Sequence, residues 1–294
     1  MNKKLIDWLI FTAIAVIWGS SFILMKIGLD NLLTPYQVAA VRMVSAGIIL
    51  LPVAVRSFRQ IPSGKLLTVF LSGILGSLLP AFLFCIAEEG IDSSLTGTLN
   101  SLTPIFVIII GALFFGKVTP AGKIIGIIIS FTGCVLLLFS KGHIQEPRHL
   151  ALVGLVVLAT VFYGINVNIV AKYLANIPSL QIAAVALTLN AIPSLFVLFI
   201  TGFFLLPFSS HQILMGTAAA VVLGVGGTAI ATILFYMLVK RAGGVFASMV
   251  TYGIPFIAIG WGIYYKENFG WSQAACLLII LLGVYWANKK SAAS

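Results

Sequence analysis

Residues 73–117 read GILGSLLPAFLFCIAEEGIDSSLTGTLNSLTPIFVIIIGALFFGK, which predicts an apolar helix, a short break and a second apolar helix with a proline near its middle. Residues 224–268 repeat this pattern at an ungapped offset of 151 positions. Five landmarks recur in register with the helix breaks: Gly73/Gly224, Gly76/Gly227, Phe84/Phe235, Pro104/Pro255 and Gly111/Gly262. Shared membrane-helix composition can supply one or two such matches, whereas five indicate an internal duplication. Duplication with glycine- or proline-interrupted apolar segments is typical of membrane transporters whose site lies between two halves.

The composition of the chain requires a lipid environment. Of 294 residues, 61% are hydrophobic and 8% are charged, and the mean hydropathy is +1.15. A soluble domain carries about 25% charged residues, so this chain cannot cover its own surface with polar groups. The net charge of +10 comes from Lys and Arg residues that stand singly or in pairs between apolar runs. Lys and Arg residues placed in this way set the orientation of a membrane protein. We therefore expect the lipid bilayer as a partner and no nucleic acid.

The apolar runs predict an all-α membrane protein with ten transmembrane helices. A span needs about 20 apolar residues. The candidates are residues 5–26, 35–55, 66–87, 93–116, 122–140, 150–171, 179–201, 213–239, 242–264 and 269–287. No clear cleavage site follows the first run, so we interpret it as an uncleaved first span.

Positive residues predict the orientation. With the N-terminus inside, 12 Lys and Arg residues fall on the inner side: Lys3, Lys4, Arg56, Arg59, Lys65, Lys117, Lys123, Lys172, Lys240, Arg241, Lys289 and Lys290. The outer loops hold 3, namely Lys141, Arg148 and Lys266. This bias predicts cytoplasmic N- and C-termini. Together with the lack of targeting segments, it suggests a bacterial inner (cell) membrane.

The charge pattern also predicts that the second half is inverted. The joint after the third span carries Glu88, Glu89 and Asp92, whereas its repeat equivalent carries Lys240 and Arg241. Because five spans is an odd number, the second copy must enter the membrane upside down, and the charge bias reverses accordingly. We therefore expect two inverted five-helix repeats, at residues 1–144 and 145–294.

At this point the sequence resembles the EamA family of the drug/metabolite transporter superfamily over essentially its whole length. The residues that carry the resemblance are Trp18-Gly19-Ser20-Ser21-Phe22 followed by Lys26, Pro35 followed by Arg42, Pro104, Pro255, and Glu267 after the ninth span. The resemblance implies secondary transport of small metabolites, often export of amino acids or related compounds, through a cavity between the halves. Two departures weaken any assignment of substrate. Gly116-Lys117 stands where the family often has an acidic residue, and residues 163–166 (Tyr-Gly-Ile-Asn) only partly match the Trp-Gly-Ser-Ser stretch.

Uncharged polar and aromatic residues near the middle of their spans are the candidates for a substrate cavity. They are Trp18, Ser20, Ser21, Asn100, Thr103, Tyr163, Asn166, Asn168, Thr251 and Tyr252. Pro104 and Pro255 are expected to break their helices and to free a carbonyl about one turn upstream. Such carbonyls can bind a ligand or can be capped by a neighbouring Ser, Thr or Asn. For each single residue, bonding between helices is an equal alternative.

Four charged residues lie toward the outer half of the spans: Lys26, Arg42, Glu88 and Glu89. An intramembrane charge is a functional hypothesis by default. Two interpretations stay open for them. The cations can pair with the carboxylates and lock the helix ends, or they can attract a substrate carboxylate or form an outer gate. No carboxylate occupies the middle of a span, so we predict facilitated diffusion, exchange, or coupling through Glu88 or Glu89.

The sequence favours a transporter over the other classes. A multidrug or other metabolite carrier of the same superfamily is the alternative to an amino-acid exporter. A membrane-embedded enzyme would need clustered catalytic groups, but His143, His149 and His211 lie in or beside loops. A structural or sensory protein is disfavoured only by the inverted repeat. The cysteines Cys85, Cys134 and Cys276 have no metal spacing, so no metal or cofactor is expected. Ten spans can enclose a cavity in one chain, and we expect a monomer that takes a small-molecule substrate.

Overall fold

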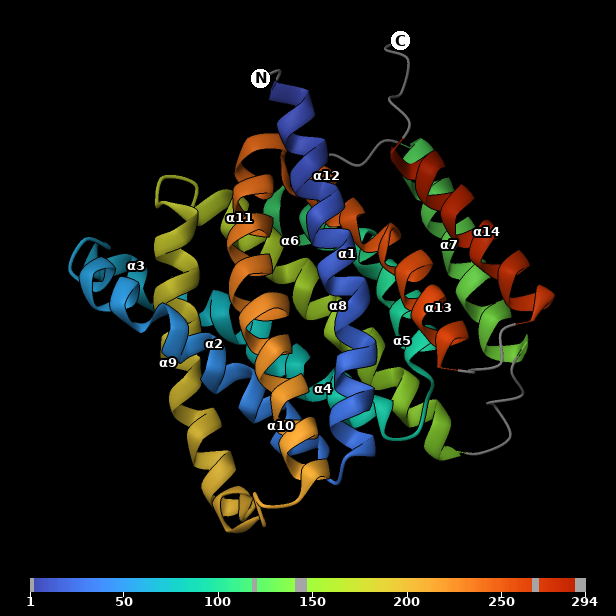
Figure 1. Cartoon of the computed structure of the whole chain (residues 1–294). Coiled ribbons are helices and arrows are strands. Elements are labelled where there is room, and N and C mark those ends of the chain that lie inside the picture. Colours follow the sequence, from blue (N-terminus) through green and yellow to red (C-terminus); the bar gives the residue numbers. More distant parts are fainter. Residues whose placement is uncertain (1–2, 118–120, 141–146, 266–269, 289–294) are drawn as a thin grey trace.

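The computed structural model describes residues 3–117, 121–140, 147–265 and 270–288, and these residues form helices and short joints (Figure 1). Each of the ten predicted ranges contains one helical segment. The boundary at residues 144/145 and the predicted positions Lys141, His143, Lys266, Glu267, Lys289 and Lys290 lie outside the described residues.

The helical elements follow one another along the chain in this order: α1 (Lys3–Asp30), α2 (Pro35–Phe58), α3 (Ser63–Gly73), η1 (Ile74–Leu78), α4 (Leu79–Glu88), α5 (Ser93–Leu99), η2 (Asn100–Leu102), α6 (Thr103–Phe115), α7 (Ala121–Ser140), α8 (Pro147–Tyr173), α9 (Ser179–Ile200), η4 (Phe203–Leu205), α10 (His211–Val222), η5 (Leu223–Ile230), α11 (Ala231–Ala242), α12 (Gly244–Ser248), η6 (Met249–Tyr252), α13 (Ile254–Tyr264) and α14 (Trp271–Asn288). The elements α3–η1–α4, α5–η2–α6, α10–η5–α11 and α12–η6–α13 each form one continuous segment with a changed helical pitch inside it.

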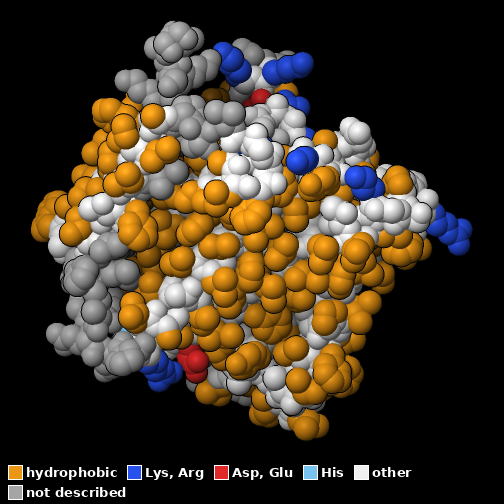
Figure 2. Space-filling view, turned by 180° about the vertical axis from the view of Figure 1, so that it is seen from behind, with side chains coloured by type: hydrophobic (Ala, Val, Ile, Leu, Met, Phe, Trp, Pro, Cys, Tyr) orange, Lys and Arg blue, Asp and Glu red, His pale blue; other side chains and the backbone are white. Residues whose placement is uncertain are grey.

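Eight of the segments in the described chain are long and apolar enough to cross a membrane. The segments that contain α7 and α14 have shorter apolar stretches, Ile124–Gly133 and Trp271–Gly283. Figure 2 shows a broad apolar surface across the middle of the molecule, with Lys and Arg side chains gathered mainly toward one end. The chain is therefore a multi-pass membrane protein. The start of α1 and the end of α14 lie at the same end of the bundle (Figure 1).

The helix irregularities recur at the offset of the sequence repeat. A π-helical turn occupies Ile74–Leu78, and another occupies Leu223–Ile230. A 3₁₀ turn at Asn100–Leu102 precedes Pro104, and one at Met249–Tyr252 precedes Pro255. Each proline stands in the first turn of the next helix, where proline is common. The two copies thus bend their chains at matching residues.

The first helix of each half packs on the other half, and glycines set these contacts. Helix α1 lies along α13, and α8 lies along α6. A Cβ built on Gly19 would lie 2.9 Å from the Ile257 Cγ2 atom, and one on Gly164 would lie 3.0 Å from the Phe106 Cβ atom. Ile257 and Phe106 are separated by the repeat offset of 151 residues, and Gly19 and Gly164 are separated by 145. The two contacts thus resemble each other, and both join one half to the other.

A second pair of equivalent contacts involves the π-helical turns. Gly73 packs against Asn190 and Ala186 of α9, and Gly224 packs against Ser45 and the Arg42 carbonyl of α2. Helices α2 and α9 also pack along each other, as do α7 and α14 at the edge of the bundle (Figure 1). Small residues permit such close approach in lipid, where no hydrophobic force drives helices together.

The Gly224 contact makes a stability prediction. In Gly224→Ala the new Cβ would overlap the Ser45 hydroxyl and the Arg42 carbonyl, and the backbone partner cannot move aside. We expect a loss of about 1–3 kcal/mol, as for other overpacked sites. Gly226→Ala is the matched control, because nothing lies within 4 Å of its Cβ position. The measurement is thermal unfolding in detergent, followed by tryptophan fluorescence. Equal unfolding midpoints for the two variants would contradict the packing argument.

Candidate functional site

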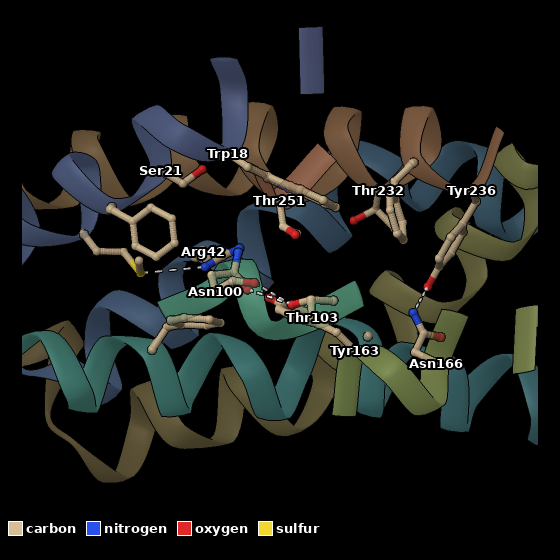
Figure 3. A pocket seen from close by; sticks show the side chains of 15 residues that line it. Trp18, Ser21, Arg42, Asn100, Thr103, Tyr163, Asn166, Thr232, Tyr236 and Thr251 are labelled. Atoms are coloured by element: carbon tan, nitrogen blue, oxygen red, sulfur yellow. Dashed lines mark hydrogen bonds between the residues drawn. The ribbon is translucent and has the colours of Figure 1, made fainter. Parts of the chain in front are cut away.

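A central cavity lies where the helix irregularities of the two halves meet. Its volume is about 50 Å³, and it is lined by Trp18, Ser21, Phe22, Met25, Arg42, Gly76, Phe84, Asn100, Thr103, Tyr163, Asn166, Thr232, Phe235, Tyr236 and Thr251 (Figure 3). These residues come from α1, α2, η1, α4, η2 and α6 of the first half and from α8, α11 and η6 of the second. The described parts of α7 and α14 contribute no lining residue. The cavity is thus shared between the halves.

Asn100 and Thr251 reach the cavity from the two 3₁₀ turns, and they are repeat equivalents. The Thr103 hydroxyl donates to the Asn100 carbonyl at 2.8 Å and lies 3.1 Å from the Asn100 Oδ1 atom. The Thr251 hydroxyl donates to the Ser248 carbonyl at 2.9 Å. Thr103 therefore caps the carbonyl that Pro104 frees, as one of the two sequence interpretations allowed. The Asn100 side chain borders the cavity.

Helix α1 is fixed to the second π-helical turn by its Trp18 side chain. The indole Nε1–H donates to the Gly227 carbonyl at 2.9 Å, and the ring lies 5.0 Å from the Phe235 ring. A Cβ on Gly227 would lie 2.6 Å from the Ser21 hydroxyl, and a Cβ on Gly76 would overlap the Asn166 amide. A glycine in each π-helical turn thus gives room for a polar side chain of the opposite half. π-Helical turns are frequent at functional sites.

Arg42 brings a charge into the cavity from α2. Its side chain is buried, with 8% exposed. The Nε atom donates to the Thr228 hydroxyl at 2.6 Å, and Nη1 lies 3.8 Å from the Met25 sulfur. These two partners are neutral. Arg42 stands about 10 Å along α2 from Pro35, so it belongs to the end of the cavity that lies away from the start of α1.

A neutral polar cluster lies at the other end of the cavity, on the side of the Arg241–Asp7 ion pair that joins the end of α11 to the start of α1. The Ser72 hydroxyl donates to the Asn166 Oδ1 atom at 2.7 Å and lies 3.2 Å from the Tyr236 hydroxyl, to which Asn166 Nδ2 donates at 3.3 Å. Figure 3 shows the Asn166–Tyr236 pair at one end of the lining and Arg42 well apart from it, toward Ser21.

The structure brings seven of the nine predicted substrate-binding residues and Arg42 together: Trp18, Ser21, Asn100, Thr103, Tyr163, Asn166 and Thr251. It does not bring Ser20 or Tyr252 into the lining. The Ser20 hydroxyl accepts a bond from Trp261 Nε1 at 2.9 Å, and Tyr252 packs in the apolar core. Asn168, also considered from the sequence, accepts from Lys117 Nζ at 2.9 Å and donates to two carbonyls between α6 and α8.

The other predicted charges lie outside the lining. Lys26 is partly buried one turn beyond Phe22 on α1. Glu88 is buried and Glu89 is exposed at the end of α4. Their predicted role as a gate or ion pair stays a prediction. In the described part of the chain, no group of three or more His, Cys, Asp and Glu side chains gathers in a geometry that could hold a metal ion.

Seven lining residues were not among the sequence candidates: Phe22, Met25, Gly76, Phe84, Thr232, Phe235 and Tyr236. Three of them, Gly76, Phe84 and Phe235, are landmarks of the repeat, so that signal was present in the sequence. Tyr236 follows Phe235 in an apolar run and carries no pattern of its own. The aromatic walls are continuous, since Phe84 lies 5.7 Å from Phe22 and stacks 6.0 Å from Tyr163.

A multi-pass helical protein with a polar and aromatic cavity shared between two similar halves belongs to the class of membrane transporters. The EamA-like transporter family matches residues 5–139 and again residues 150–289. The chain belongs to this family, within the drug/metabolite transporter superfamily.

Related proteins are named as members of this class. An uncharacterized transporter of Archaeoglobus fulgidus is 25% identical over 96% of this chain and 99% of its own length. A protein of Escherichia coli K12 named a probable amino-acid metabolite efflux pump is 26% identical over 55% of this chain and 51% of its own. A crystal structure at 17% identity superposes with a TM-score of 0.65 over 96% of both chains, which shows the fold alone.

The buried cluster at the neutral end generates a second prediction. Tyr236→Phe removes the hydroxyl that Ser72 and Asn166 share, and it leaves a buried amide with one partner fewer. We expect a loss of about 1 kcal/mol of stability. The control is Tyr285→Phe, whose side chain is exposed on α14. Thermal unfolding of the two variants side by side should show a lower midpoint for Tyr236→Phe only; an unchanged midpoint would show that the cluster does not stabilise the fold.

Proposed function

We propose that the protein is a secondary transporter that exports amino acids or related small metabolites across the cytoplasmic membrane. The observation that carries this proposal is the central cavity, which both halves line within membrane-spanning helices. Its walls combine aromatic rings with a few polar groups, as small-molecule sites do. The name of the E. coli relative, a probable amino-acid metabolite efflux pump, supports the class of cargo.

The mechanism that we propose is alternating access between two inverted five-helix repeats, with all ten helical segments in the membrane. Three observations support this arrangement. The family matches the chain twice, the helix irregularities recur at an offset of 151 residues, and the glycine contacts between halves recur with them. In such repeats the site is fixed at the interface, and the halves rock around it.

The small volume of the cavity also supports a moving mechanism. About 50 Å³ holds a few water molecules, whereas small-molecule sites measure about 300–1,000 Å³. A metabolite therefore enters only after the halves move apart.

One chain lines the whole cavity, so we propose that a monomer carries out transport. Flux should then persist in vesicles reconstituted with fewer than one chain each, and flux only at higher loading would contradict it.

The transport proposal is tested by counterflow in proteoliposomes with a panel of labelled amino acids and their metabolites. Asn100→Ala and Thr251→Ala should each lower saturable uptake by about ten-fold, because each removes a cavity group. Thr98→Ala and Ser248→Ala are matched controls in the same segments. Their hydroxyls bond the Ser94 and Val245 carbonyls away from the cavity.

Two results of this assay would count against the proposal. Equal losses of uptake in the lining and control variants would show that transport does not depend on the cavity residues. Absence of flux across the whole panel would contradict the proposed cargo, and amphipathic drugs would then be the next panel.

The proposed orientation places both termini in the cytoplasm. The positive-inside bias and the shared position of the α1 start and the α14 end support it. Green fluorescent protein fused to the C-terminus should fluoresce in bacterial cells, and alkaline phosphatase fused after Gly90 should be active. An inactive phosphatase at Gly90, with an active one at the C-terminus, would reverse the orientation.

A further inference from the structure

A second cavity lies toward the end of the bundle where α1 starts, between the joint that follows α2 and the joint that follows α8. Its volume is about 410 Å³, and it is lined by Gln60, Pro62, Lys65, Lys172, Tyr173, Ala175, Asn176, Ile177, Pro178 and Gln181. The Gln181 Nε2 atom donates to Gln60 Oε1 at 2.6 Å, and α3 lies beside α9 (Figure 1). This cavity therefore bridges the two halves, and it shares no lining residue with the central cavity.

Two ammonium groups give this second cavity a positive charge. The Lys65 Nζ atom lies 5.9 Å from the centre of the Tyr173 ring, and the Lys172 Nζ atom lies 5.5 Å from it. Among the described residues that line the cavity there is no Asp or Glu. Elsewhere in the described chain, Asp7 pairs with Arg241, and the other carboxylates lie at or just beyond the far ends of α1 and α4. Because two like charges around one ring repel each other, the cavity favours an anion.

An apolar groove continues from this cavity toward the middle of the membrane. Its volume is about 280 Å³, and it is lined by Leu51, Ala54, Val55, Phe58, Arg59, Val185, Thr188 and Leu189. On α2 the groove begins at Arg59, next to Gln60 of the cavity, and on α9 it begins at Val185, one turn after Gln181. From residue 59 to residue 51 it runs about 12 Å along α2, which is most of one half of a hydrocarbon core about 30 Å thick. The groove thus has the place and the length of an acyl chain of one leaflet.

A charged cavity at the end of the spans and an apolar groove below it together match a phospholipid. Lys ammonium groups bind phosphate as point charges, and aromatic rings such as that of Tyr173 are frequent at headgroup depth. A soluble anion would leave the groove unused. A zwitterionic phospholipid would bring its own cation toward the two Lys side chains, whereas an anionic one would not.

We propose that this cavity binds the phosphate of an anionic phospholipid, with one acyl chain in the groove between α2 and α9. In the proposed orientation the lipid belongs to the cytoplasmic leaflet, whose negative surface attracts basic segments. The bound lipid contacts the joint after α2 in the first half and the joint after α8 in the second. It therefore stabilises the packing of the two halves at this end of the bundle.

A matched set of three probes tests the ligand class on the unaltered protein. Dioleoylphosphatidylglycerol and dioleoylphosphatidylcholine share their acyl chains and differ in net charge, and glycerophosphoglycerol is the anionic headgroup without chains. Native mass spectrometry of the purified chain in detergent measures the affinity of the first bound molecule. We expect phosphatidylglycerol to bind about ten-fold or more tighter than phosphatidylcholine and to raise the unfolding midpoint, with no binding of glycerophosphoglycerol at the same concentration.

Two results with these probes would overturn the proposal. Equal affinity for the two lipids would show that the cavity does not select charge. Binding of glycerophosphoglycerol as tight as that of the intact lipid would assign the cavity to a soluble anion.

A double variant tests the charged cavity. Lys65→Gln combined with Lys172→Gln should weaken the first phosphatidylglycerol by about ten-fold or more and leave phosphatidylcholine nearly unchanged. Lys3→Gln combined with Lys4→Gln is the matched control, because it removes the same charge from the same end of the bundle outside the cavity. Equal losses in the two double variants would assign the effect to the general surface charge and contradict the site. Unfolding midpoints without lipid show whether each variant is folded.

A second pair of variants tests the groove. Val55 is 64% exposed and lines the groove, and Leu67 is 67% exposed on α3 away from it. Val55→Trp fills the groove and should weaken phosphatidylglycerol by about three-fold or more, because the chain loses apolar contact. Leu67→Trp should leave the affinity unchanged. Equal affinities in the two variants would remove the acyl chain from the groove and contradict the proposal.

Discussion

A chain surrounded by lipid must satisfy its backbone hydrogen bonds inside each segment, and the rest of this structure depends on that constraint. It makes every long segment helical, and it permits irregular backbone only where protein covers it. Three of the changes of helical pitch, at η1, η2 and η6, accordingly line the cavity, and the fourth, at η5, bonds the lining residues Trp18 and Arg42. The changes of helical pitch and the candidate site thus lie together, because both need backbone that protein covers and lipid does not reach.

Close packing replaces the hydrophobic effect between these helices. Glycines bring α1 onto α13 and α8 onto α6, so each half is held by the first helix of the other. The glycines of the π-helical turns, Gly227 and Gly76, leave room for the Ser21 and Asn166 side chains, which would not fit beside larger residues. The repeat therefore supplies more than a similar shape: it places matching contacts where the two halves meet.

The chemistry of the cavity departs from this backbone symmetry. Cys85 and Tyr236 are equivalent at an offset of 151 residues, yet one is a thiol beside Met25 and the other completes a hydrogen-bonded cluster. Asn100 is equivalent to Thr251. Equivalent positions thus carry different side chains, and Arg42 adds a charge to the lining that the cluster of Ser72, Asn166 and Tyr236 lacks.

The sequence by itself determined the lipid environment, the ten helical segments, the repeat and the family, because apolar runs and recurring Gly, Phe and Pro residues are local signals. Only the tertiary structure decided which polar residues share a cavity. Neighbours on a helix point about 100° apart, so Ser21 faces the cavity while Ser20 meets Trp261. Thr251 and Tyr252 divide in the same way. Tyr236 joined the site through contacts with Ser72 and Asn166, which lie more than 60 residues away in the chain and leave no pattern in it.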